Sequence, residues 1–296
     1  MTTKAVYHGV LTTVVGLGLV LASSAADATN CTVDNWSLAV ELTDDNVGTQ
    51  GANNRRYAGP CGLRVPVSGT LRYLQDDTPA NEAVFNVRFY FFLNDVTGDV
   101  TLFQAAASNN DPVITATYDQ SASAIDVDIA HATATQTLVA EGVDVTSWNS
   151  LEIQWKADGA ETAKVILVNA DLTDEVIGSA VNTSELRIDR ARLGVLGVTS
   201  GATGSIDFDD YDSRRESVPG RLCRGLTDPD RAVGNSGFQE LKFADIDNIF
   251  AEIASRGASP SAGVPDFDQD GQVKFSDLDA VFQRIASRQV SCAVNS

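Results

Sequence analysis

Residues 36–213 alternate between apolar and polar side chains with a period of two, and turn residues interrupt this pattern at short intervals. Successive side chains of a β-strand point to opposite faces, so each alternating run predicts a strand with one buried face. The expected strands cover residues 85–91, 101–104, 113–118, 125–129, 151–155, 163–168, 187–196 and 206–208. No helical stripe of useful length interrupts the run. We therefore predict a mainly β domain built as a two-sheet antiparallel sandwich.

The segments between these strands are rich in turn-forming residues. Asn94-Asp95, residues 109–112, Asp158-Gly159 and residues 199–204 combine Asn, Asp, Gly, Pro and Thr. Such residues tolerate the left-handed backbone conformations that tight turns require. We expect a chain reversal at each of the four.

A different pattern occupies residues 266–277, which read Asp-Phe-Asp-Gln-Asp-Gly-Gln-Val-Lys-Phe-Ser-Asp. This is the spacing of a twelve-residue calcium loop, with Gly271 at the sharp turn. The expected oxygen ligands come from Asp266, Asp268, Asp270, Asp277 and the carbonyl of Gln272. The alternative is an acidic surface turn in an Asp-rich chain. The number of matches in register, followed by a helical pattern, favours calcium as the cofactor.

The helical pattern after this loop has a counterpart earlier in the chain. Residues 274–282 match residues 242–250 at an offset of 32, and both copies continue to Ile-Ala-Ser-Arg. Each copy has one apolar stripe at helical spacing. The stripes consist of Ile246, Ile249, Phe250 and Ile253 in the first copy, and Leu278, Val281, Phe282 and Ile285 in the second. Two facing stripes would make a small two-helix core that neither helix buries alone.

The first copy lacks most of the calcium ligands. Asp245 matches Asp277, but Gly234, Ser236, Phe238 and Gln239 stand where the second copy has its other three aspartates and its glycine. One carboxylate does not hold Ca²⁺, which takes six to eight oxygen ligands. We therefore predict a single calcium site, with the first copy kept for packing.

This tandem unit resembles a dockerin domain, the loop-helix module that docks polysaccharide-degrading enzymes onto cohesin partners. The resemblance covers residues 223–296 and implies a small α-helical, EF-hand-like module that binds calcium. It also implies a cohesin-like partner. Where dockerins carry a small polar pair for that contact, this chain has Phe275-Ser276 and Phe243-Ala244. Calcium binding therefore carries over better than cohesin binding.

Residues 1–28 have the features of a secretory signal peptide. Lys4 precedes an apolar run at residues 10–22, and Ala26-Asp27-Ala28 fits a small-x-small cleavage site. A retained N-terminal anchor is the alternative, although the run is short for a bilayer span and no later segment is long enough. We expect a secreted bacterial protein, extracellular or at the cell surface and not inserted in a membrane. Its sandwich would occupy residues 29–222.

The chain carries a formal net charge of −19. Nucleic acids and anionic membranes attract proteins that have a positive face, so neither is expected as a partner. An acidic surface suits solubility and cation binding.

Four cysteines follow the expected signal peptide. In an oxidising compartment an even number of cysteines predicts disulfides, here two, with three pairings open. We favour Cys31–Cys61 and Cys223–Cys292, because the second pair brackets the duplicated module. Free thiols or a zinc site are weaker interpretations, since no CxxC spacing is present and histidine is scarce.

The order of features in the large domain resembles another family. A Trp-containing segment at 148–155 precedes an expected hairpin, and Arg192-Leu193-Gly194-Val195 is followed by Gly-Ser-Ile-Asp-Phe-Asp-Asp-Tyr at residues 204–211. Residues 36–213 are thereby similar to the concanavalin A-like jelly roll of laminin-G and legume-lectin relatives. That family contains lectins, glucanases, lyases and adhesion modules, so the resemblance implies a fold rather than one function.

Catalytic residues are not evident. A retaining β-glucanase of this fold carries Glu-x-Asp-x-x-Glu on one strand, with the two acids about 5 Å apart, and this chain has no such run. Glu152 alternates with apolar neighbours and is expected to point outward into solvent. We assign no catalytic residue, and whether the protein is an enzyme stays open.

The acidic strand at residues 207–212 allows two functional interpretations. Asp207 and Asp209 share a face and, with Asp210 and Asp212, would form a second cation site or an acid pair. The preferred interpretation is an acidic, solvent-facing strand edge. A lyase would need a base and a cation, for which Tyr211, Arg214 and Arg215 are close in sequence only.

Aromatic side chains offer platforms for sugar stacking. The candidates are Trp36, Tyr57, Tyr73, Tyr118 and Trp148. Trp155 is in register with apolar residues and is expected in the core, whereas Trp148 begins a strand, where its ring can be exposed.

These features support one leading function and two alternatives. The leading hypothesis is a secreted, calcium-binding protein without catalytic activity, whose sandwich recognises a polysaccharide or cell-surface glycan. The first alternative is a polysaccharide-active hydrolase or lyase tethered through its tail. The second is a structural protein of the cell surface or matrix.

Overall fold

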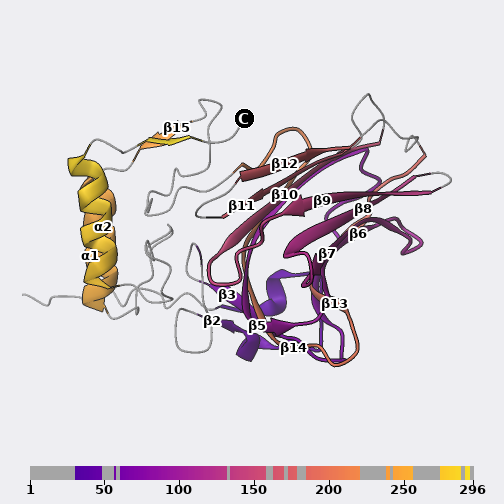
Figure 1. Cartoon of the computed structure of the whole chain (residues 1–296), viewed down its shortest axis with the longest axis horizontal. Coiled ribbons are helices and arrows are strands. Elements are labelled where there is room, and N and C mark those ends of the chain that lie inside the picture. Colours follow the sequence, from indigo (N-terminus) through magenta and orange to yellow (C-terminus); the bar gives the residue numbers. More distant parts are fainter. Residues whose placement is uncertain are drawn as a thin grey trace, which may run out of the picture.

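The computed structural model describes residues 31–48, 57, 61–131, 134–157, 163–169, 173–178, 185–220, 238–240, 243–255, 274–287 and 291–293. Most of these residues belong to a sandwich of two seven-stranded sheets, in which every pair of neighbouring strands is antiparallel (Figure 1). The mainly β sandwich predicted from the alternating pattern is confirmed.

In both sheets the spatial order of the strands differs from their order in the sequence. The first sheet contains β1 (Leu38–Val40), β4 (Arg72–Asp76), β13 (Arg190–Val198), β6 (Val100–Ala106), β7 (Pro112–Asp119), β8 (Ala124–Ala130) and β9 (Thr135–Glu141), in that spatial order. The second contains β12 (Thr173–Ile177), β11 (Ala163–Val168), β10 (Asn149–Lys156), β5 (Val84–Thr97), β14 (Thr203–Arg214), β3 (Gly62–Pro66) and β2 (Val47–Gly48). Late strands pair between early ones in each sheet, as in a jelly roll.

The core forms where the inner faces of the two sheets meet. Phe85, Val87, Phe89 and Phe91 of β5 are fully buried, as their alternation predicts. Phe89 packs its ring 5.5 Å from that of Phe103 on the opposite sheet. Trp155 is also part of this core, as expected.

The turn predicted at Asn94-Asp95 is wrong. Asn94 and Asp95 lie inside β5, which continues to Thr97. Asp95 has a φ of 49°, and the pairing of β5 with β14 shifts register beside it, near Gly204. The turn-forming residues therefore serve a β-bulge, which needs the same left-handed backbone as a turn.

Short elements complete the described part of the chain. Two 3₁₀ helices, η1 (Val33–Asn35) and η2 (Asp44–Asn46), lie near its start, and β15 (Phe238–Glu240) pairs with β16 (Ser291–Ala293) near its end. Among the described residues, no helix is both long and apolar enough to cross a membrane.

The duplicated segments form helices where their stripes predict them. These are α1 (Phe243–Ser255) and α2 (Phe275–Ala286), which pack against each other (Figure 1). Ile249 and Val281, at equivalent positions of the two stripes, are fully buried. Phe250 and Phe282 of the same stripes are 51% and 43% exposed, so the two helices bury these stripes only in part.

Candidate functional site

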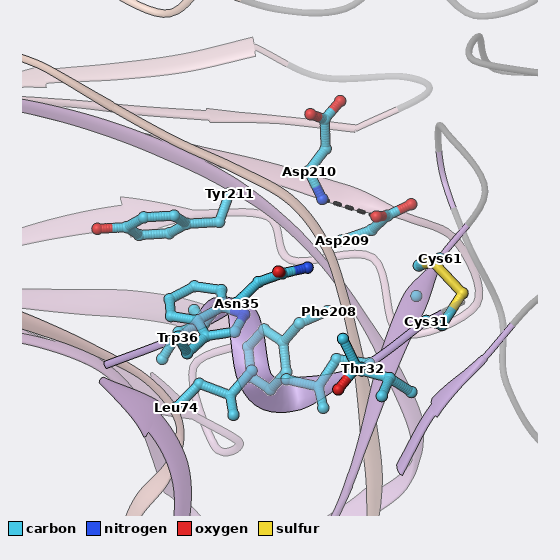
Figure 2. Close-up of a pocket in the computed structure, with 14 residues that line it drawn as sticks. Cys31, Thr32, Asn35, Trp36, Cys61, Leu74, Phe208, Asp209, Asp210 and Tyr211 are labelled. Atoms are coloured by element: carbon cyan, nitrogen blue, oxygen red, sulfur yellow. Dashed lines mark hydrogen bonds between the residues drawn. A yellow bond between two sulfur atoms is a disulfide. The ribbon is translucent and has the colours of Figure 1, made fainter. Parts of the chain in front are cut away.

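A pocket of about 330 Å³ opens beside β14 and the N-terminal segment of the described chain. Its volume is at the lower end of the range of ligand pockets. Its lining includes polar groups and rings from Thr32, Asn35, Trp36, Asp209, Asp210 and Tyr211, and apolar side chains from both sheets, among them Leu63, Leu74, Leu193 and Phe208. Figure 2 shows the two rings on one side of the pocket and the Cys31–Cys61 disulfide on the other.

The N-terminal wall of the pocket is held by its caps and by the disulfide. The Thr32 hydroxyl accepts a hydrogen bond from the Asp34 N–H and donates one to Asp44 Oδ1, at 2.9 Å. That carboxylate also accepts from the Val33 N–H. Cys31 is joined to Cys61 at the start of β3, which confirms the first predicted disulfide. These bonds place Trp36, directly after η1, at the edge of the pocket.

A second part of the pocket wall is a bulge in β14. Asp209 pairs with Tyr90 and Asp212 with Arg88, so the register shifts between them, and Asp210 has a φ of 49°. The extra residue turns Tyr211 toward Trp36, with ring centroids 5.1 Å apart. A bulge re-aims a side chain in this way at the rim of a sheet.

The surroundings of the Tyr211 hydroxyl disfavour its ionised form. Burial is the main cause that raises its pKa above the ordinary value, and the nearby Asp76 carboxylate adds to the effect. The phenol therefore stays protonated throughout the physiological range. A lyase mechanism with Tyr211 as the proton-abstracting base is not supported by this environment.

The acidic strand edge is not exposed to solvent, contrary to the preferred sequence interpretation. Asp207 is fully buried and binds Arg64 through both oxygens, at 2.6 and 2.7 Å, and also accepts from Asn94 Nδ2. Asp209 is buried and accepts from the main-chain N–H groups of Tyr57 and Asp210. The outer face of the second sheet is covered by other parts of the chain, which no strand pattern reveals.

A second cation site on this strand is also unsupported. Asp210 forms an ion pair with Arg88 at 3.2 Å, and Asp212 forms one with Arg214 at 2.7 Å. In the described part of the chain no group of three or more metal-ligating side chains occurs.

The two arginines close to Tyr211 in the sequence bind two different carboxylates. Arg214 binds the Asp212 carboxylate, and Arg215 pairs with Glu82 and lies over the Phe85 ring. Arg88, which the sequence did not single out, instead contacts Asp210 of the bulge. Burial works to lower its pKa, but Asp210, then Tyr90, Asp212 and Glu152, outweigh burial, and the pKa of Arg88 is raised.

Two expectations about single residues of the segment 148–155 do not hold. Glu152 is buried on the outer face and accepts hydrogen bonds from the Gly220 N–H and from Gln154, both at 2.7 Å. Trp148, whose position at the start of a strand allowed an exposed ring, is 2% exposed. It packs in a small cluster with Tyr57, Tyr90 and Phe92 on the same covered face.

Of the five aromatic candidates, the pocket includes Trp36. Tyr118 belongs to the core, and Tyr73 lies under the Arg192 guanidinium at 5.5 Å. Sequence reasoning missed Thr32 and Asn35 as pocket residues. Their only signal is a capping pattern before a short helix, which is common at any helix start.

The predicted calcium ligands are mostly beyond the described residues. Asp266, Asp268, Asp270 and Gln272 lie outside them, as does Cys223 of the second expected disulfide. Asp277 is described, is fully buried and accepts the Lys274 N–H at 2.7 Å at the start of α2. The calcium site stays a prediction.

We expect the disulfide to matter more for the pocket than for the sandwich. It closes a 30-residue separation at one edge of the domain, where chain entropy gives up to about 3–4 kcal/mol. Replacing Cys31 and Cys61 by serine should lower the thermal midpoint and raise the accessibility of Trp36 to acrylamide. Tryptophan fluorescence during thermal unfolding gives the midpoint, and acrylamide quenching of the folded protein gives the accessibility of Trp36. An unchanged Trp36 environment would contradict a role of the disulfide in holding the pocket wall.

Comparisons with known proteins give distant structural likenesses. No protein-family model matches the sequence, and no curated protein matches it. An endo-β-1,4-glucuronan lyase from the fungus Trichoderma reesei is similar over 62% of this chain and 92% of its own, with a TM-score of 0.44 and 10% identity. An alginate lyase from Alteromonas sp. 272 has a TM-score of 0.37 and 9% identity over 58% of this chain and 95% of its own.

A cellulose-induced protein is similar over 58% of this chain and 85% of its own, with a TM-score of 0.43 and 13% identity. At such scores and identities these likenesses do not indicate what this chain binds or does. Its function has to be argued from its own residues.

Proposed function

We propose that this protein is a glycan-binding protein whose pocket holds a sugar against the rings of Trp36 and Tyr211. The observation that carries the proposal is this ring wall at the edge of a pocket with hydrogen-bonding groups. Sugar rings have an apolar face that packs on an aromatic ring and hydroxyl groups that need donors and acceptors. Asn35 and Thr32 offer such groups beside Trp36.

The proposal is for binding without bond cleavage. Glycoside hydrolysis needs two carboxyl groups flanking one bond, whereas Asp207 is fully buried with both oxygens bound by Arg64. Tyr211 stays protonated, and the arginines near it are held in ion pairs. These contacts support recognition over catalysis.

A panel of polysaccharides tests the proposal. Full-length protein should bind at least one soluble glycan, with a change in tryptophan emission, and release no reducing ends or unsaturated products. Absence of binding to every glycan, with a normal unfolding transition, would contradict the proposal. Release of products would replace it with the enzyme alternative.

We further propose that the protein is exported by the signal at residues 1–28 and that its tail, residues 223–296, binds one calcium ion. The support is the loop spacing at residues 266–277. The buried Asp277 at the start of α2 is compatible with the last ligand position. A cohesin-like partner remains an expectation of the dockerin resemblance. Phe243 and Phe275, which replace the small residues of the usual contact, are 64% and 63% exposed.

The tail makes a specific mutational prediction. Asp270→Ala removes a carboxylate ligand and should lower Ca²⁺ affinity at least about tenfold. Ser236→Ala, at a neighbouring ligand position of the degenerate copy, should have no effect. Calcium titration calorimetry of the two full-length variants measures this difference. Equal losses would overturn the assignment of one site to the second copy.

A further inference from the structure

Residues 217–220, which we call the strap, lie across the outer face of the second sheet after β14 ends. Asn86 Nδ2 donates to the Ser217 carbonyl at 3.1 Å, and Arg88 Nη1 donates to the Gly220 carbonyl at 2.6 Å. The Gly220 N–H donates to Glu152 Oε2 at 2.7 Å. The strap is therefore fixed by side chains of β5 and β10, and its last residue, Gly220, is bound through both its N–H and its carbonyl.

The two charged residues that hold Gly220 are cross-strand partners. Arg88 on β5 lies directly opposite Glu152 on β10 in the strand pairing, and the exposed fractions of the two residues are 2% and 5%. Burying charged groups costs free energy that apolar residues of similar size would avoid. Stability alone does not account for a buried Arg at this position, and its further contacts lie at the bulge of β14.

The same guanidinium also holds the bulge of β14. Arg88 Nη2 donates to the Asp210 carbonyl at 3.1 Å and pairs with the Asp210 carboxylate at 3.2 Å. A bulge residue lacks its regular ladder partner, so its backbone groups need others. Arg88 supplies such a partner to the Asp210 carbonyl through Nη2. Through Nη1, the same guanidinium donates to the Gly220 carbonyl of the strap.

The bulge in turn sets one wall of the pocket. Asp210 is in the left-handed conformation, and Tyr211, the next residue, directs its ring to Trp36. A shift of the Asp210 backbone would therefore move the Tyr211 ring. The chain of contacts runs from Gly220 through Arg88 and Asp210 to the ring wall.

We propose that Arg88 is a positioning residue that ties the strap to the pocket, so that the seating of Gly220 sets the geometry of the Trp36–Tyr211 wall. The effect of this tie on glycan affinity rests on the proposed function. Its effect on the wall does not, because Trp36 reports on the wall directly. The other two tryptophans, Trp148 and Trp155, are 2% and 1% exposed, so a collisional quencher reaches Trp36 almost alone.

The sharpest test is a pair of identical substitutions. Gly220 has a φ of 71°, so Gly220→Ala strains the strap where Arg88 and Glu152 hold it. Gly201→Ala introduces the same strain, at a φ of 86°, in a turn with no atom within 4 Å of the new methyl group. Acrylamide quenching should increase and the emission should shift to longer wavelength in Gly220→Ala, but not in Gly201→Ala.

A second variant tests whether the change in Trp36 quenching depends on Arg88 and not on the strap alone. Arg88→Lys keeps a positive charge, but a single ammonium group lacks the rigid fork that reaches Gly220 and Asp210 together. It should change Trp36 quenching as Gly220→Ala does. Any glycan found in the panel should bind both variants about three- to tenfold more weakly than wild type.

The outcomes separate the two proposals. If both variants lose stability but leave Trp36 quenching at the wild-type value, Arg88 is only a structural anchor and the inference is overturned. If quenching changes while wild-type protein binds no glycan, the tie exists and the proposed function fails. If affinity falls equally in Gly201→Ala, the loss follows from general destabilisation, which also overturns the inference.

Discussion

Replacing Gly194 with alanine should destabilise the sandwich by roughly 3–5 kcal/mol, the sum of backbone strain and overpacking in a tightly paired sheet. Gly194 has a φ of 147° in the middle of β13, opposite Tyr73 of β4. A Cβ atom there would collide with the Arg72 carbonyl oxygen and lie 2.7 Å from Tyr73 Cα. Both obstacles are backbone atoms, so no change of rotamer relieves them.

Gly197→Ala on the same strand is the matched control. Its new Cβ would approach the Thr101 hydroxyl at 3.2 Å, a side chain that can move, and should cost no more than about 1 kcal/mol. Urea unfolding followed by tryptophan fluorescence measures both variants, since all three tryptophans belong to the sandwich. Equal midpoints for the two variants would show that β13 and β4 are not as closely apposed as described.

Trp36→Ala should abolish most glycan affinity, by about 30-fold or more, which is the 2 kcal/mol typical of a buried aromatic anchor. The indole forms one side of the pocket and packs against Tyr211. The sandwich should stay folded, because Trp36 lies outside the buried core and packs only against its edge. Calorimetric titration with the best glycan of the panel measures the loss.

Two controls accompany Trp36→Ala. Trp36→Phe keeps a flat apolar ring and should retain affinity within about fivefold, since most of the stacking face remains. Trp148→Phe changes a buried tryptophan outside the pocket and should leave affinity unchanged. A loss in Trp148→Phe as large as in Trp36→Ala would move the binding site to the outer face of the second sheet.

Most of the fold was predictable because it rests on local periodicity. Residues 163–168 were expected as a strand and form β11 with the same bounds. The expected strand at 187–196 is β13, at Arg190–Val198, displaced because the bridge at Ile188 precedes it. The error at Asn94-Asp95 has a general cause: bulges and turns use the same residue types, and only the pairing partner distinguishes them.

The site was less predictable because it depends on contacts between distant segments. Alternation correctly placed Glu152, Asp207 and Asp209 on the outer face of their strands, but it gives no information on what covers that face. The strap covers that face at Glu152, and Tyr57 covers it at Asp209. Each covering segment is far in sequence from the residue that it contacts. The Asp209-Asp210-Tyr211 run, where alternation breaks, was the one local signal of the bulge.

The even number of cysteines predicted disulfides but left three pairings open, and the favoured pairing included the Cys31–Cys61 bond. The repeat predicted both helices of the tail. The calcium loop rests on its spacing alone, since its first four ligands lie outside the described residues. Ile249 and Val281 were assigned to one core by the offset of 32 and are both fully buried. Internal repetition is informative for these two positions, but Phe250 and Phe282 of the same stripes are exposed.

The most direct test of the central claim is acrylamide quenching of Trp36 in wild-type protein, measured with and without a glycan that calorimetry shows to bind. A sugar in the pocket must cover the indole, so quenching should fall as the glycan saturates the protein, with the same midpoint as the heat of binding. Heat of binding without any protection of Trp36 would place the ligand elsewhere and contradict the assignment of this pocket.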